Sequence, residues 1–187
     1  MIHHLQTWEQ GSPVAYYFFD FGSHAKRTAL GCISSIALQL CEQSSTLHKS
    51  AISLYEQYPG GCYDVTALSK AIGCMLRDST KSFIIIDALD ECLQEDDERG
   101  QVLSCLEHIH ATAHTSRCLV SSRVEPDIRS ALDDLGATNV QMLSVDIDKD
   151  IKAYVQSRLV KDKGLSKWNQ RVKDEIEVKV LLKSKGM

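Results

Sequence analysis

The sequence lacks long apolar runs, so no membrane-spanning helix is predicted. The longest apolar stretches, such as residues 14–19, are far shorter than the roughly 18 residues that a transmembrane helix needs. The first ten residues do not show a charged segment followed by an apolar one, so no secretory signal is predicted. We therefore expect a chain that has no membrane partner.

A basic excess is also lacking. The 187 residues include 21 Lys plus Arg against 25 Asp plus Glu, and the formal net charge is -4. A large nucleic-acid footprint requires clustered positive charge, so nucleic acid is not an expected partner. Hydrophobic residues make up 43% and charged residues 25%, as in ordinary globular domains, and no internal repeat or low-complexity segment is present.

Cysteine is plentiful, with seven residues, but close pairs are missing. The cysteines lie at positions 32, 41, 62, 74, 92, 105 and 118, and no two have CxxC or CxC spacing. An odd, unpaired set does not indicate a disulfide framework or a structural zinc site. The pattern predicts reduced cysteines in a reducing, cytoplasmic compartment.

Apolar runs alternate with helical periodicity along the chain. Strands are predicted at residues 14–21, 83–87, 117–121 and 140–143. Helices are predicted at residues 28–44, 48–58, 125–135 and after Gly164, with others opening at Asp64, after an acidic loop at 94–100, and at Asp148. This alternation predicts an α/β fold with a parallel sheet.

The run Phe83–Ile86 is continuously apolar, so it is predicted to be the central strand, with both of its faces covered. We expect residues 14–21 on one side of it and residues 118–121 on the other. Residues 1–145 would form the sheet-containing core. Residues 146–187 look entirely helical and would begin a helical arm.

Three carboxylates follow the central strand within Phe83–Cys92. Asp87 ends the strand, where ligands bind in open α/β folds, and a carboxylate there can hold Mg²⁺ through water. Asp90 and Glu91 open the next loop and could orient a water molecule. Two alternatives remain open from these residues: a capped, solvated turn, or a hydrolase that uses the three carboxylates directly on a metal.

The string Phe83–Cys92 resembles the Walker B segment of NACHT-type STAND NTPases. More narrowly, the chain is similar to fungal NACHT proteins with a nephrocystin-3-like N-terminal domain, many of which carry ankyrin or WD-type repeats. Residues 14–21, 53–56, 119–128 and 183–187 also resemble segments of that group.

The resemblance implies a P-loop NTPase core that acts as a regulatory switch controlled by ATP or GTP with Mg²⁺. In it, Asp87 would organise the Mg²⁺, and Glu91 or Asp90 would position the hydrolytic water. Arg123 would be the sensor arginine near the γ-phosphate. The resemblance also implies self-association or protein partners through flanking domains.

Arg123 has an alternative interpretation as a surface arginine that pairs with Glu125 or Asp127. The chain also departs from the family at Val124, where proline is common, and this puts the geometry of the turn in doubt.

The phosphate-binding loop is missing from the sequence. There is no GxxxxGK[ST] motif, and no lysine directly follows a glycine. In the family, that loop and its strand precede the first strand seen here, so we expect a truncated core that is marginally stable and exposes apolar surface. Nucleotide binding should be weaker than about 1 mM without the backbone cradle and its lysine. The alternative function is a non-catalytic scaffold that does not bind nucleotide.

Overall fold

The computed structural model describes residues 11–43, 52–53, 56–58, 63–77, 79–140 and 144–184. The chain divides into two compact units, Met1–Ala137 and Thr138–Met187, which are described separately below. The predicted helix at 48–58 lies largely outside the described residues, as do residues 141–143 of the predicted fourth strand.

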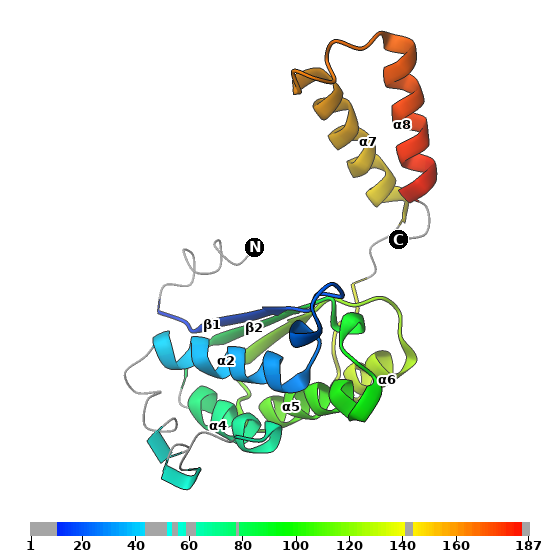
Figure 1. Ribbon diagram of the computed structural model, residues 1–187. Coiled ribbons are helices and arrows are strands. Elements are labelled where there is room, and N and C mark those ends of the chain that lie inside the picture. The colour runs from blue at the N-terminus through cyan, green and yellow to red at the C-terminus, as the bar shows by residue number, and fades with distance from the viewer. Residues whose placement is uncertain are drawn as a thin grey trace. The chain divides into compact units, whose positions relative to one another are not determined.

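A three-stranded parallel sheet is the centre of the first unit (Figure 1). Its strands are β1 (Val14–Phe18), β2 (Ser82–Asp87) and β3 (Ser116–Val120), in the order β1-β2-β3. Val14 is in register with Phe83, and Ser82 with Ser116. The α/β fold, the parallel sheet and the central position of the second strand are confirmed.

Three helices pack against one face of this sheet: α2 (Ala29–Gln43), α4 (Val65–Arg77) and α5 (Glu98–Thr112) (Figure 1). Ile84 and Ile86 of β2 join their core, and both are at most 2% exposed. The core residues of these helices are Ala29, Cys32, Ile33, Ile36, Ala37, Leu40, Leu68, Ala71, Ile72, Met75, Leu76, Val102, Leu103, Cys105, Leu106 and Ile109. Apolar residues three and four apart form these buried stripes, as helical periodicity requires.

The other face of the sheet carries the alternate residues of each strand. Ile85 is buried there, but Phe18 and Leu119 are 46% and 48% exposed. The prediction that the central strand is covered on both faces therefore holds at Ile85, while the flanking strands present apolar side chains to solvent.

Helix starts were predictable where a polar cap or a proline marks them. The Asp64 carboxylate accepts a hydrogen bond from the Ala67 N–H at 2.6 Å and caps α4, as predicted. Pro126 opens α6 (Pro126–Asp134), whose Ile128 is buried. The fixed φ of proline and its missing N–H both suit the first helical turn.

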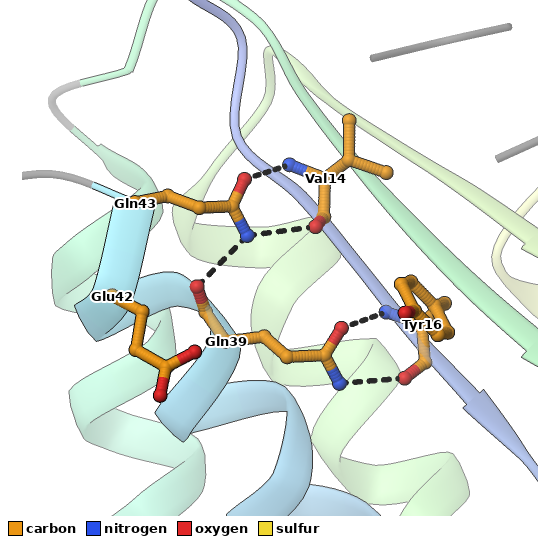
Figure 2. A pocket seen from close by; sticks show the side chains of 5 residues that line it. All are labelled: Val14, Tyr16, Gln39, Glu42 and Gln43. Carbon is orange, nitrogen blue, oxygen red and sulfur yellow. Dashed lines mark hydrogen bonds between the residues drawn. The ribbon is translucent and has the colours of Figure 1, made fainter. Parts of the chain in front are cut away.

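The outer edge of β1 is covered by side chains of α2 (Figure 2). Gln43 accepts from the Val14 N–H at 2.9 Å and donates to the Val14 carbonyl at 2.8 Å. Gln39 accepts from the Tyr16 N–H at 3.1 Å and donates to the Tyr16 carbonyl at 2.8 Å. A shallow pocket lies here, lined by these four residues and Glu42.

Several sequence-based boundaries are wrong. The first strand ends at Phe18 because the chain turns at Asp20, whose side chain accepts from the Gly22 N–H at 3.0 Å. The acidic run is not a loop throughout: a 3-10 turn, η3 (Glu95–Asp97), leads into α5 at Glu98. Leu30 shares the three- and four-residue spacing of Ile33, Ala37 and Leu40, which predicts burial, but it is 46% exposed.

The second unit contains two helices, α7 (Ser144–Lys161) and α8 (Gln170–Ser184). Asp148 was expected to cap the first of these, but it lies inside α7. Glu177 joins the two helices, because its carboxylate lies 3.4 Å from the Lys152 ammonium and accepts from the Gln156 amide at 3.1 Å. In the part of the chain that the structure describes, no helix combines the length and apolar character that a bilayer crossing requires.

Candidate functional site

The candidate site lies at the carboxyl edge of the sheet, where β2 ends at Asp87. The Ser121 hydroxyl donates a hydrogen bond to the Asp87 carboxylate and accepts one from the Ala88 N–H at 3.0 Å. The Ser121 carbonyl accepts from the Leu89 N–H at 3.0 Å. One residue just beyond β3 thus connects the ends of two strands.

Ala88 adopts a left-handed conformation, with φ 55° and ψ 48°. Residues other than glycine seldom adopt the left-handed region, and the small side chain of alanine limits the steric cost of doing so. The turn takes the chain directly from β2 into η2 (Leu89–Glu91) and places Asp90 and Glu91 next to the strand end. The bonds from Ser121 hold this turn in place.

Asp90 is engaged by Arg123. Its carboxylate accepts from the Arg123 backbone N–H at 3.0 Å, and its second oxygen lies 3.6 Å from the Arg123 Nε. The Asp90 side chain is only 12% exposed, whereas that of Arg123 is 75% exposed. The alternative partners that the sequence suggested for Arg123, Glu125 and Asp127, are not the ones it pairs with.

Glu91 faces the segment that follows β1. Its Oε2 accepts a hydrogen bond from the Phe21 backbone N–H at 2.7 Å. Its carbonyl accepts from the Arg27 Nε at 3.0 Å, and the Arg27 guanidinium lies 4.7 Å from the centre of the Phe21 ring. Asp87, Asp90, Glu91 and Arg123 therefore gather at the ends of all three strands.

Arg99 lies beneath this edge and was missed by sequence reasoning. It is 4% exposed and donates from Nη2 to the carbonyls of Asp90 at 2.7 Å and Cys92 at 3.2 Å. Its Nη1 lies 3.1 Å from the Asp127 carboxylate at the start of α6. Its Nε is buried without a hydrogen-bond partner among the described residues. Because Arg99 sits within an acidic run, the sequence gives no sign that it is buried.

The neighbouring Arg99 affects the pKa of the Asp127 carboxyl. Desolvation raises the pKa of Asp127, but the hydrogen bond and the charge of Arg99, together with hydrogen bonds from the backbone N–H groups of Ile128 and Asp127, lower it by more in total, so the pKa lies below its ordinary value. Arg99 therefore links the Asp90 turn to α6.

The donor set at this edge fits one kind of metal binding only. Within the described ranges, no three Asp, Glu, His or Cys side chains form a group that could hold a metal ion. Mg²⁺, however, keeps most of its water and is bound through one or two carboxylates together with substrate phosphates. In that mode Asp87 would be the metal-binding carboxylate. The hydrolase hypothesis requires three carboxylates on one metal ion, and the described residues form no such group.

Fold and site together define an α/β domain with a parallel sheet whose carboxyl edge brings together carboxylates and arginines. The sequence model of the family described as "Nephrocystin 3, N-terminal" matches residues 1–123. The chain belongs to this family. Comparisons with curated proteins and with solved structures returned no match.

Proposed function

We propose that this chain is the part of a NACHT-type nucleotide-binding switch that carries the Walker B strand and the sensor turn. The observation that carries the proposal is the convergence of Asp87 and Arg123 at one edge of the sheet. Ser121 bonds to Asp87, and Arg123 follows two residues later, held by Asp90. A metal-binding carboxylate and a fixed cation on adjacent strand ends suit a polyphosphate.

Each of the four site residues would have a separate role in such a switch. Asp87 would hold Mg²⁺ through water, and the bound ion would neutralise phosphate charge. Asp90 already uses both oxygens on Arg123, whereas Glu91 uses Oε2 on one backbone N–H. Glu91 is therefore the better candidate for orienting a water molecule, and Asp90 is the better candidate for holding Arg123 until phosphate competes for it.

A scaffold that does not bind nucleotide is the second candidate. It is favoured by the hydrogen bonds and the ion pair that already engage Asp87, Asp90 and Glu91 within the protein. It is also favoured by the absence of a GxxxxGK[ST] motif from this sequence, since that loop supplies most phosphate contacts.

Ligand-observed NMR titration with ATP and GTP, in Mg²⁺ and in EDTA, separates the two candidates. If the chain is such a switch, it is expected to bind weakly, with a dissociation constant above about 1 mM, because its sequence has no GxxxxGK[ST] loop. That binding should require Mg²⁺ and disappear in Asp87→Ala. Asp96→Ala is the matched control, since Asp96 is an exposed acid in η3. Absence of binding would establish the scaffold instead, and binding that is indifferent to both Mg²⁺ and Asp87→Ala would refute the proposed site at Asp87.

A further inference from the structure

Two ion pairs of opposite direction join the segment after β2 to the segment after β3. The carboxylate of Asp90, which follows β2, lies 3.6 Å from the Nε of Arg123, which follows β3. In the reverse sense, the Nη1 of Arg99 lies 3.1 Å from the Asp127 carboxylate at the start of α6. Arg123 and Asp127 are only four positions apart, so the two pairs hold the two ends of one short stretch of chain.

The two pairs differ in which member can move. The Arg123 side chain is 75% exposed, so its guanidinium can leave Asp90 for solvent or for a phosphate. The Arg99 side chain is only 5% exposed, and its Nη2 also donates to the carbonyls of Asp90 and Cys92. Arg99 cannot turn away from Asp127 without breaking these bonds as well. The pair of Arg99 with Asp127 is therefore the fixed one, and the pair of Asp90 with Arg123 is the exchangeable one.

Burial makes Arg99 dependent on the Asp127 carboxylate. A charge that is removed from water is costly unless it is paired and hydrogen-bonded. Among the described residues, Asp127 is the acid that bonds to Arg99, whereas its other two acceptors are uncharged carbonyls. The Arg99 Nε has no partner there to compensate. Neutralising Asp127 would therefore leave a buried cation without its acid, and the start of α6 would lose this attachment to the turn after β2.

The chain between Arg123 and Asp127 transmits the position of one residue to the other. Glu125 is extended, with φ -113° and ψ 133°, and Pro126 begins α6. Proline fixes its own φ and restricts the residue before it to extended conformations. A displacement of Asp127 is therefore passed along the backbone to Arg123 and is not absorbed on the way.

We propose that Arg99 and Asp127 are positioning residues for Arg123. Their ion pair fixes residues 123–127 on the turn after β2, and so determines how far the Arg123 guanidinium extends toward a phosphate. The phosphate part of this proposal rests on the proposed function, whereas the fixing of Arg123 does not.

Backbone ¹⁵N relaxation, measured by NMR on the full chain, tests the fixing of Arg123 in the folded state. The Arg123 amide bonds to Asp90 and should be rigid in the wild type, with an order parameter of about 0.85. Asp127→Asn should lower this order parameter to about 0.6 or less. Asp127→Glu keeps the charge and should keep the amide rigid. Glu125→Gln is the matched control, because it removes the same charge two positions away from a side chain that makes no capping bond.

These variants separate positioning from general stability. A loss of global stability leaves the order of the folded state unchanged, so it would not make the Arg123 amide mobile. Circular dichroism reports whether each variant is folded, which is expected because the Asp127 side chain is half-exposed. A rigid Arg123 amide in Asp127→Asn would overturn the proposal, as would a mobile one in Asp127→Glu or in Glu125→Gln.

Titration with Mg-ATP, followed by ligand-observed NMR, tests whether phosphate binding depends on this positioning. The association constant is expected to fall about threefold or more in Asp127→Asn and to keep its wild-type value in Glu125→Gln. Unchanged binding in an Asp127→Asn variant whose Arg123 is mobile would overturn the proposal. A wild type that binds no ATP would refute the proposed function instead, and the order of the Arg123 amide would still decide whether Arg99 and Asp127 position Arg123.

Discussion

Replacing both Gln39 and Gln43 by alanine is expected to destabilise the fold, and the size of the loss follows from the hydrogen bonds that the two side chains make. Gln39 and Gln43 make four bonds to Val14 and Tyr16, at 2.8–3.1 Å. A hydrogen bond contributes about 0.5–1.5 kcal/mol net, so four bonds contribute roughly 2–6 kcal/mol. Gln43 is exposed, and water can replace some of these bonds. Alanine also favours the helix slightly. We therefore expect the double alanine variant to lose about 2–3 kcal/mol of unfolding free energy, in the lower part of that range.

The Gln39→Glu and Gln43→Glu double variant separates the hydrogen-bond acceptor of each side-chain amide from its donor. Glutamate still accepts from the backbone N–H groups but no longer donates to the Val14 and Tyr16 carbonyls, so two of the four bonds are lost. Each second carboxylate oxygen would face a backbone carbonyl oxygen, which repels it, so the expected loss is at least that of the alanine variant, about 2–3 kcal/mol or more.

Urea unfolding, followed by circular dichroism, measures both losses. Glu42→Ala is the matched control, because Glu42 lies on the same turn of α2 and is exposed, so its effect should stay within about 0.5 kcal/mol. A double alanine variant as stable as this control would refute the argument that the amides stabilise the β1 edge.

Two other expected outcomes concern titratable groups. The Asp127 pKa is lowered in the folded state, so the carboxylate stabilises the fold above its unfolded pKa of about 3.9, and this contribution is lost as the pH falls through the folded pKa. Asp127→Asn should therefore lose less stability on acidification below about pH 4 than the wild type, as measured by urea unfolding, and an unchanged pH slope would count against the Arg99 pair. Burial raises the pKa of the Cys92 thiol to about 12 and of the Cys105 thiol to about 11. Iodoacetamide at about pH 8 should label exposed Cys74 in the folded protein and the two buried thiols only in urea, as read by mass spectrometry; equal labelling of Cys92 and Cys74 without urea would contradict this.

The sequence predicted the fold best where its signal is local and periodic. The stripe Leu68, Ile72 and Leu76 is buried as its spacing required, and the apolar run ending at Asp87 is the central strand. Leu30 lies three residues before Ile33 but is exposed, because it lies at the border of the buried stripe of α2, whose members are Ala29, Cys32, Ile33, Ile36, Ala37 and Leu40. Periodicity indicates which face of a helix is apolar, but not how wide the covered part of that face is.

The site was predictable in its location more than in its contacts. The position of Asp87 and Arg123 after two parallel strands was enough to place them at one edge. The roles of Asp87, Asp90, Glu91 and Arg123 in nucleotide chemistry stay predictions. Ser121 could have been suspected as a hydroxyl directly after a strand at that edge, but Arg99 carried no signal, because a buried arginine and a solvated one look alike within an acidic run.

By itself the sequence determined the types of element, their order, and the apolar strand that ends in a carboxylate, because these depend on residues within one or two turns of each other. Only the tertiary structure decided which charges meet. Glu91 bonds to a backbone N–H 70 positions away, and Asp90 to one 33 positions away. It also decided that the Gln39 and Gln43 amides bond to the outer edge of β1. Such pairings follow from the packing of whole helices on the sheet, and no local pattern records them.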